Sequence, residues 1–392
     1  MIVRRRLSAM VTAAAFGISS MVPAASETDD SSQGPEHAYG ALGANFNQNL
    51  DSIDYGELEL AGAEWVRGFY QMPETDDGDP SQHFAIENIL EASERGHQTI
   101  LTLSYPYDQT SFPEPGSPQM QQELDRLDEV LPLVVDDVDI LVVGNEPFIQ
   151  SQPEERDSRL NEFYEAIAEH IIDFRGAHCL QDCGTLLYMG ALNRLDLEER
   201  RTPATARWMD FVHDTPELEG VNIHPHVPDP EASQDFLDYI LPRMRDDQTF
   251  LVTEFSIVWL WQEHLEDPAD AEFLDQYGFE PGAEVWEVVG AAIEDPFTEE
   301  QWSDFLRSSD WFMEHSDFLH HQMELFRDTE RLAVATYGFR QDELMVEDFG
   351  PDKDPWLFNS VFAAYTVEPR KDTAAPGFWL DSFQEIQDYS RE

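Results

Sequence analysis

Two glutamates stand in short polar motifs that directly follow apolar runs of the chain. Glu146 lies in the motif VGNEP, and Glu254 lies in the motif VTEF. Two carboxyl groups that face each other can cleave a glycosidic bond, because one protonates the departing oxygen while the other attacks or hydrates the anomeric carbon. Either motif alone is a weak signal, since a glutamate before proline can cap a helix and any strand can end in a charged residue. The chemistry therefore depends on a fold that brings the two together.

Three basic side chains also follow apolar runs. Arg67 could hold a neighbouring carboxylate ionised, or it could be the partner in a structural ion pair. His224 and His226, in the motif NIHPH, could converge on a metal ion. We expect no metal, because barrel metallohydrolases usually carry a His-x-His pair on their first strand and the run GANFN has none. We also expect no cofactor, because no glycine-rich phosphate loop follows a predicted strand.

The apolar runs alternate with charge-rich stretches of helical length, which is typical of βα units on a parallel sheet. The predicted strands are 41–46, 64–69, 99–104, 139–144, 186–191, 220–223, 249–253 and 332–337. The predicted helices between them are 84–95, 118–135, 156–175, 203–214 and 232–245. Eight strands in one chain of this length favour a closed (β/α)8 TIM barrel over a doubly wound sheet. In such a barrel, Glu146 and Glu254 would lie at one mouth, because catalytic groups sit at the C-terminal strand ends.

The interval between the seventh and eighth predicted strands is much longer than one helix requires. We predict an insertion there, at about 260–330, with its own helices lying over the barrel mouth. Its tryptophans could form a core or stack on sugar rings; they include Trp259, Trp261, Trp286, Trp302 and Trp311. A last helix is predicted at 355–365.

The motifs VGNEP and VTEF, at the ends of the fourth and seventh predicted strands, resemble those of a large clan of retaining glycoside hydrolases. This clan includes cellulases, mannanases and xylosidases. The resemblance implies a (β/α)8 barrel in which Glu146 is the acid/base and Glu254 is the nucleophile. It also implies that Asn145 holds the sugar 2-hydroxyl and that Arg67 keeps the nucleophile ionised.

The sixth and eighth predicted strands match the clan less closely. His224 and His226 occupy a position where a His-x-Tyr pair is common, and the tyrosine there usually bonds the nucleophile. Tyr337 stands where many members carry a sugar-stacking tryptophan, so Tyr337, or Trp259 or Trp261 from the insertion, is expected to contact the sugar. The resemblance covers about 41–339 and is informative at four strand ends.

The implied activity is retaining hydrolysis of O-glycosidic bonds in an oligo- or polysaccharide by double displacement. Two alternatives stay open. One is a transglycosylase that uses the same site, and the other is a catalytically inactive barrel that binds carbohydrate. The expected partner in each case is a carbohydrate.

The chain is strongly acidic. It has 80 Asp and Glu against 23 Lys and Arg, a formal net charge of −57, and its only lysines are Lys353 and Lys371. The acidic residues are spread along the chain, which indicates a solvated surface adapted to high salt, because about 1 M salt shortens the Debye length to about 3 Å. An acidic site for a cationic partner is the alternative. We expect no nucleic-acid partner, because no basic stripe in the sequence could neutralise phosphates.

The first residues are typical of an export signal, which we place at 1–26. Arg4, Arg5 and Arg6 precede an apolar stretch that small residues follow, as in a twin-arginine signal. Serine, threonine and glycine within the stretch argue against a stable membrane span. We expect a linker at 27–37, a single catalytic domain at 38–392 and a secreted protein.

The chain has two cysteines, Cys179 and Cys183. Export would permit a small local disulfide between them. A metal site would need further ligands at suitable spacing, and His178 alone does not supply them. We therefore interpret the pair as structural.

Overall fold

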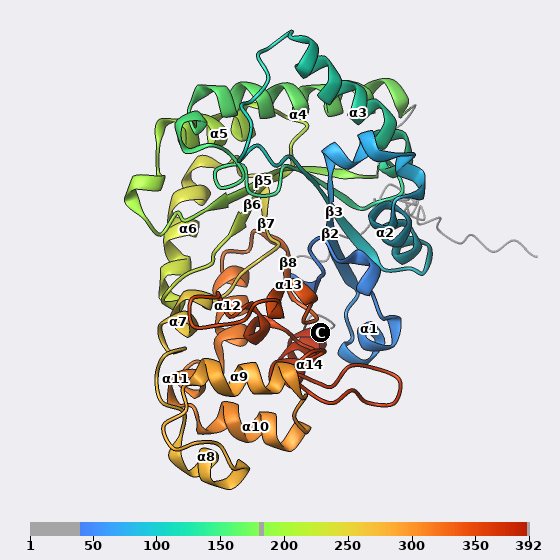
Figure 1. Ribbon diagram of the computed structural model, residues 1–392. Helices are drawn as coiled ribbons and strands as arrows, with labels where there is room; N and C mark the ends of the chain where they lie inside the picture. Colours follow the sequence, from blue (N-terminus) through green and yellow to red (C-terminus); the bar gives the residue numbers. More distant parts are fainter. Residues whose placement is uncertain (1–39, 180–183, 390–392) are drawn as a thin grey trace, which may run out of the picture. The chain divides into compact units, whose positions relative to one another are not determined.

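A computed structural model describes residues 40–179 and 184–389 of the chain. Within them, eight parallel strands form a closed barrel in sequence order, and β8 pairs with β1 (Figure 1). The strands are β1 (Ala41–Asn45), β2 (Trp65–Gln71), β3 (Gln98–Ser104), β4 (Ile140–Val143), β5 (Leu186–Asn193), β6 (Gly220–His224), β7 (Thr249–Val252) and β8 (Leu332–Gly338). Each predicted strand overlaps an observed one, and the predicted (β/α)8 fold is confirmed.

Helices connect the first seven strands. They are α1 (Tyr55–Ala61), α2 (Phe84–Glu94), α3 (Pro118–Val134), α4 (Ser158–His178), α5 (Pro203–Asp214) and α6 (Ser233–Ile240). Several begin at a side chain that caps the helix, such as Asp54 before α1 and Thr202 before α5. The helix predicted at 232–245 is shorter in the structure, because Pro242 lies in a 3-10 turn that follows α6. Within the described residues, no helix is long and apolar enough to cross a membrane.

The barrel interior changes from apolar to polar along the strands. One layer is a cluster that includes Trp65, Ile100, Val142, Tyr188, Leu251 and Val334. Two residues further along four of these strands stand polar side chains, namely Arg67, Thr102, Thr253 and Thr336. Alternate residues of a strand face the same side, so the polar layer lies nearer the C-terminal strand ends. The fold therefore supplies an apolar floor beneath a polar site.

Six helices lie between β7 and β8. They are α7 (Val258–Glu263), α8 (Ala271–Tyr277), α9 (Val285–Glu294), α10 (Glu299–Ser308), α11 (Asp310–Met313) and α12 (Phe318–Arg327). In Figure 1, α8, α9 and α10 lie together at the bottom of the view. This segment shares an aromatic core with the chain after β8, in which Trp261 packs near Phe312, Phe358 and Trp379.

The segment after β8 differs from the prediction. The helix predicted at 355–365 is wrong, because only Trp356–Asn359 forms a 3-10 turn. The buried side chain of Gln341 explains the irregular path: its Oε1 accepts from the backbone N–H groups of Tyr365 and Thr366, and its Nε2 donates to the carbonyl of Leu357. The helices here are instead α13 (Glu343–Val346) and α14 (Leu380–Tyr389).

The predicted export signal at 1–26, the linker at 27–37 and Cys183 lie outside the described residues. The disulfide between Cys179 and Cys183 therefore stays a prediction.

Replacing Gly190 with alanine is expected to destabilise the protein by roughly 1–3 kcal/mol. A Cβ at this position in β5 would lie 2.1 Å from the carbonyl oxygen of Gly144, at the end of β4, so the backbone would have to shift. Gly176→Ala is the matched control, because Gly176 is exposed in α4 with no atom near its Cβ position. It should be neutral or stabilising by up to about 1 kcal/mol. Equal denaturant midpoints for the two variants would contradict this packing.

Candidate active site

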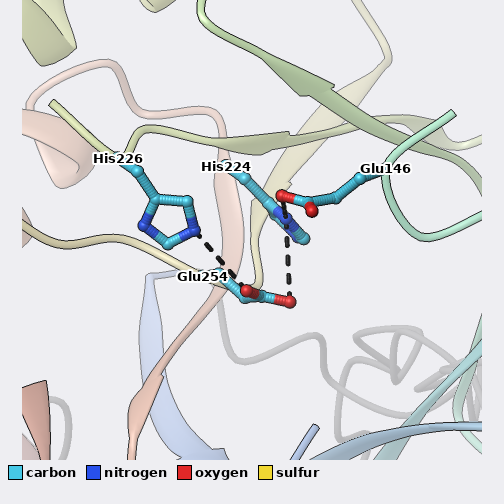
Figure 2. A group of neighbouring side chains, drawn as sticks. All are labelled: Glu146, His224, His226 and Glu254. Carbon is cyan, nitrogen blue, oxygen red and sulfur yellow. Dashed lines mark hydrogen bonds and ion pairs between the residues drawn. The ribbon is translucent and has the colours of Figure 1, made fainter. Parts of the chain in front are cut away.

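Glu146 and Glu254 face each other at the C-terminal mouth of the barrel. Glu146 follows β4 and Glu254 follows β7, and Figure 2 shows both carboxylates turned toward His224. One oxygen of each carboxylate lies within 4.8 Å of the other. Both side chains are partly open to solvent, with 18% and 14% exposed. The sequence prediction that the fold would bring these residues together agrees with this placement.

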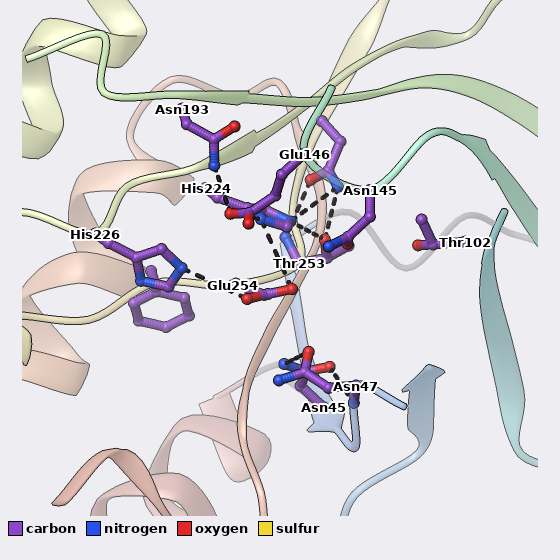
Figure 3. A network of polar contacts seen from close by, with 12 residues as sticks. Asn45, Asn47, Thr102, Asn145, Glu146, Asn193, His224, His226, Thr253 and Glu254 are labelled. Carbon is purple, nitrogen blue, oxygen red and sulfur yellow. Dashed lines mark hydrogen bonds and ion pairs between the residues drawn. The ribbon is translucent and has the colours of Figure 1, made fainter. Parts of the chain in front are cut away.

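Arg67 links Glu254 to the ends of two other strands. Its side chain is fully buried, and Nη1 donates to Glu254 Oε1 at 2.7 Å. The same nitrogen donates to Asn45, the last residue of β1, and to Asn47, while Nη2 donates to Asn145 Oδ1 at 2.6 Å. Figure 3 labels these three asparagines together with Glu254. Because Asn145 uses its oxygen for Arg67, its amide nitrogen is left as a donor. Because this bond is made to Glu254, it is consistent with a role for Arg67 in keeping that carboxylate ionised.

The surroundings of Glu254 favour its ionised form. Burial alone raises the pKa of this carboxyl group. Attraction to His224, when that ring is protonated, and to Arg67 outweighs burial, and His226 adds a hydrogen bond, so the pKa of the Glu254 carboxyl lies well below its ordinary value. An ionised carboxylate in a partly dry site is suited to nucleophilic attack.

His226 reaches Glu254 from the position where the clan usually has tyrosine. Its Nε2 lies 3.5 Å from Glu254 Oε2, and its Nδ1 lies 2.8 Å from the hydroxyl oxygen of Ser256. If the hydroxyl donates to Nδ1, Nε2 is left to donate toward the carboxylate. The ring of Trp356 meets the His226 ring edge-on, with the ring centres 4.9 Å apart. The imidazole thus approaches Glu254 although it stands where the clan usually has tyrosine.

A chain of hydrogen bonds sets the orientation of the buried His224 ring. The backbone N–H of Thr253 donates to Asn222 Oδ1 at 3.1 Å, so the Asn222 Nδ2 is the group that donates to Thr253 Oγ1 at 2.6 Å. The Thr253 hydroxyl is then free to donate to His224 Nε2 at 2.8 Å. This leaves the hydrogen of the ring on Nδ1, which lies 3.0 Å from Glu146 Oε1.

A tight turn after β4 presents Glu146 to this ring. Gly144 has a φ of 92°, and a Cβ there would lie 2.6 Å from the Tyr164 ring. The turn carries Glu146 beyond the strand, where its Oε1 accepts from His224 and from Asn193 Nδ2. Asn193 ends β5 and was not a sequence candidate, because its contact with Glu146 joins two strands.

The two glutamates and the two histidines could in principle also offer ligands to a metal. One atom of each lies within 4.8 Å of the others. However, the hydrogen on His224 Nδ1 points where a metal would need a lone pair. The charge of Arg67, 2.7 Å from Glu254, also opposes a cation at this carboxylate. The donor set fits proton transfer better than metal binding.

A pocket of about 170 Å³ opens in front of Glu254. Its lining residues are Asn45, Asn47, Gln48, His226, Glu254, Gly338, Asp342, Leu344, Met345, Trp356 and Asn359. These residues follow β1, β6, β7 and β8, and none of them belongs to 260–330. The segment after β8 therefore forms part of the wall of this pocket, whereas the sequence predicts that an insertion at about 260–330 lies over the barrel mouth.

Two of these lining residues were not candidates from the sequence. Trp356 is a half-buried aromatic residue with its ring against His226. Asp342 accepts from Asn49 Nδ2 at 2.8 Å, and burial raises the pKa of its carboxyl group. Asp342 caps the short helix α13 and Trp356 begins the 3-10 turn at 356–359, and neither directly follows a predicted strand.

Trp259 lies at the edge of the site. The centre of its half-buried ring lies 6.4 Å from that of the His226 ring, and the guanidinium carbon of Arg194 lies over the same tryptophan ring, 4.1 Å from its centre. This placement agrees with the expectation that one tryptophan of the segment after β7 comes close to the mouth. Trp261, in contrast, is fully buried in the core.

Tyr337 does not reach the pocket, which corrects the expectation that it contacts the sugar. Its side chain is fully buried and packs against Phe255 and Trp379. The preceding residue, Thr336, bonds to the carbonyl of Thr253 inside the barrel. Since neighbouring strand residues face opposite sides, Tyr337 must face outward.

Two solved structures of glycoside hydrolases resemble the fold of this chain. The structure of a family 39 glycoside hydrolase from the gut symbiont Bacteroides cellulosilyticus WH2 aligns with 90% of this chain at 12% identity and a TM-score of 0.51. This chain spans 64% of the length of that chain. A β-glucosidase from Exiguobacterium marinum aligns with 91% of this chain and 98% of its own at 9% identity and a TM-score of 0.50. No protein-family model and no curated protein matches the sequence. At these identities the likeness shows a shared barrel fold.

Replacing Arg67 with methionine is expected to weaken the loss of stability in acid. Glu254 has a lowered pKa in the folded protein and an ordinary value of 4.5 when exposed. Its ionised form therefore stabilises the fold above about pH 4.5, and this contribution is lost as the pH falls toward the lowered value. Without Arg67 the pKa is less depressed, although His224 still lowers it, so the variant should lose up to about 1 kcal/mol less unfolding free energy than the native protein between about pH 6 and pH 3.

The control for this measurement is Arg370→Met. Arg370 pairs with Glu299, and both side chains are about half exposed. An exposed pair contributes little, so this variant should follow the native protein across the same pH range. An acid loss in Arg67→Met equal to the native one would contradict the inferred stabilisation of ionised Glu254.

The His224 ring is expected to carry its hydrogen on Nδ1. The ¹⁵N resonances of the ring nitrogens distinguish the two tautomers, and His224→Gln identifies the signals by their loss. Thr253→Val removes the hydroxyl that donates to Nε2, so it should weaken this preference. A native ring with its hydrogen on Nε2 would refute the hydrogen-bond order given above and would reopen the metal interpretation.

Proposed function

We propose that this protein is a retaining glycoside hydrolase that cleaves O-glycosidic bonds of an oligo- or polysaccharide. The observation that carries the proposal is the pair of facing carboxylates in different surroundings. His224 and Arg67 favour the ionised form of Glu254, whereas Glu146 is bonded to His224 and Asn193 and contacts no arginine among the residues that the structure describes. Two carboxyl groups with different surroundings are suited to separate acid and nucleophile roles.

The separation of the two carboxylates supports retention. Retaining enzymes place the groups roughly 5–5.5 Å apart, whereas inverting enzymes leave roughly 6.5–9.5 Å for a water molecule. One oxygen of Glu146 lies within 4.8 Å of one oxygen of Glu254, which is nearer to the retaining separation than to the inverting one. This closeness supports direct attack of Glu254 on the sugar.

The first step forms a glycosyl-enzyme. The Glu254 carboxylate attacks the anomeric carbon and forms a carbon–oxygen bond, while the bond from that carbon to the leaving oxygen breaks. Glu146 enters this step protonated and gives its proton to the leaving oxygen. The amide nitrogen of Asn145, left free by Arg67, is positioned to donate to the sugar 2-hydroxyl.

The second step returns the enzyme to its starting state. Glu146, now ionised, takes a proton from a water molecule whose oxygen attacks the anomeric carbon. The bond between Glu254 and the sugar breaks, and the carboxylate returns to Arg67. Two inversions at one carbon leave the product with the configuration of the substrate.

The sugar that is attacked would lie in the pocket in front of Glu254. Trp356 and Trp259 offer aromatic faces near His226, and Asp342 offers a carboxyl group for sugar hydroxyls. The fold likeness to a family 39 glycoside hydrolase and a β-glucosidase agrees with carbohydrate as the substrate class. We also propose that the protein is exported and works in concentrated salt, because of its twin-arginine pattern and its net charge of −57.

Glu254→Gln is expected to abolish turnover, and Glu146→Ala is expected to lower it by roughly 10²–10⁴-fold. Azide should restore part of the activity of Glu146→Ala by attacking the glycosyl-enzyme without base assistance, and the product should be a glycosyl azide of retained configuration. The measurement is a glycan panel in molar salt, with ¹H NMR of the first anomer released. Glu91→Gln, on the exposed face of α2, is the control and should keep native activity.

Each alternative has its own result. Release of the inverted anomer, or native turnover in Glu254→Gln, would end the retaining proposal. Sugar transfer to an added acceptor in place of hydrolysis would indicate a transglycosylase. Binding without turnover across the panel would indicate an inactive barrel.

A further inference from the structure

A second cavity, of about 410 Å³, has arginines in its wall. Arg156, Arg194 and Arg200 all line it, and so does Asn193, which donates to Glu146. The volume falls within the roughly 300–1,000 Å³ that is usual for ligand pockets. Three arginines around one cavity stand out in a chain with 23 basic and 80 acidic residues.

Two of these arginines have no acidic partner among the described residues. The ion pairs of this region join Arg194 to Asp196 and Arg201 to Asp235, and neither Arg156 nor Arg200 takes part in one. Burial, and then repulsion from Arg200, lower the pKa of Arg156. Two close cations without a carboxylate are costly in a partly buried site unless an anion joins them.

The other contacts of Arg156 hold it in place without cancelling its charge. Its Nε and Nη2 donate to the backbone carbonyls of Ser151 and Ile149. Within the described chain its Nη1 has no hydrogen-bond acceptor. These backbone contacts give part of the Arg156 guanidinium a structural role. The Arg200 side chain makes no hydrogen bond or ion pair among the described residues, so it has no such role.

Arg194 connects this cavity with the active site. It directly follows β5 with a φ of 52°, and Asp196 holds its guanidinium through two hydrogen bonds. The same guanidinium lies 4.1 Å from the ring centre of Trp259, which neighbours His226. The positive charge is thereby fixed between the pocket of the nucleophile and the second cavity.

The chemistry of the proposed reaction assigns a side to each cavity. The attacked sugar must contact Glu254, which lines the first pocket. The leaving sugar must contact Glu146, because Glu146 protonates the oxygen that departs with it. Asn193 bonds to Glu146 and lines the second cavity, so the second cavity lies on the leaving-group side.

We propose that the arginine-lined cavity binds an anionic sugar unit, a uronate carboxylate or a sulfate ester, on the leaving-group side of the cleaved bond. This inference rests on the proposed glycosidase activity. The planar guanidinium group of Arg200 can bond two oxygens of such an anion, and Nη1 of Arg156 can donate a further hydrogen bond to it. Glu199 also lines the cavity, but its side chain is exposed at the rim. The substrate would then be an acidic polysaccharide.

The arginines also answer a difficulty that the net charge creates. A protein with a formal charge of −57 repels an anionic polymer at long range. Salt at about 1 M reduces that repulsion to distances of about 3 Å, while direct contacts between guanidinium and anion persist at shorter range. High salt would therefore help approach, and the cavity would supply recognition.

The first test compares substrates by kcat/KM. Oligosaccharides that are neutral, that contain uronate and that carry sulfate are assayed in molar salt with the native protein and with Arg200→Gln. The native protein should prefer one anionic class, and Arg200→Gln should reduce that preference roughly ten-fold through KM. The class that loses most identifies carboxylate or sulfate. A native preference for neutral substrates, or an unchanged preference in Arg200→Gln, would overturn the inference.

Arg370→Gln is the matched control for loss of one positive charge. Arg370 lies on the surface in a pair with Glu299, and it should keep both the native activity and the native preference. An equal loss of preference in this variant would mean that overall charge, not the cavity, selects the substrate, which would overturn the inference.

The second test does not depend on turnover. Calorimetric titration of Glu254→Gln with glucose, glucuronate and glucose 6-sulfate compares sugars that differ at one carbon. Tighter binding of one anionic sugar, lost when Arg200→Gln is added, supports the inference even if the glycan panel shows no cleavage. Equal binding of glucose and both anions overturns it and leaves the glycosidase proposal intact. Binding of inorganic sulfate as tight as that of either sugar also overturns it, because the cavity would then be a simple anion site.

Discussion

Burial of the Arg67 guanidinium inside the barrel is the constraint on which the site depends. A cation without solvent contact loses hydration worth several kcal/mol, and only well-placed acceptors offset that cost. Here the acceptors are Glu254, Asn45, Asn47 and Asn145, which come from the ends of β7, β1 and β4. The same contacts that satisfy the charge therefore hold three strand ends in register. Loss of any one of these acceptors would leave the buried charge less well compensated.

This constraint also makes the two glutamates unequal. Arg67 contacts Glu254 and not Glu146, so the two carboxyl groups share a mouth but not an electrostatic environment. His224 lies between them, with Nδ1 3.0 Å from Glu146 and 3.7 Å from Glu254. Hydrogen bonds from Asn222 to Thr253 and from Thr253 to His224 Nε2 fix the orientation of this ring. The polar layer of the barrel thus gives the two carboxyl groups the different surroundings on which the proposed acid and nucleophile roles depend.

The sequence predicts most of the barrel because each strand is a local apolar run. It also identifies site candidates at the ends of these runs, namely Glu146, Glu254, Arg67 and His224. It does not predict Asp342 or Trp356, which lie in the chain folded around the Gln341 amide, a contact between distant residues. The outward orientation of Tyr337 follows from the alternation of side chains along β8. Thr336 is a polar residue of that strand and faces the barrel interior, so Tyr337 faces the outside.

The wall that the segment after β8 builds beside Glu254 has a consequence for how such a protein can change. The groups that would break the bond belong to strand ends locked by Arg67, whereas Asp342, Leu344 and Trp356 belong to one later stretch of chain. Insertions or deletions in that stretch could remodel the shape offered to a sugar while the charged centre stays as it is. Selectivity at this pocket and bond cleavage then depend on separate stretches of the chain, so mutations can change one without changing the other.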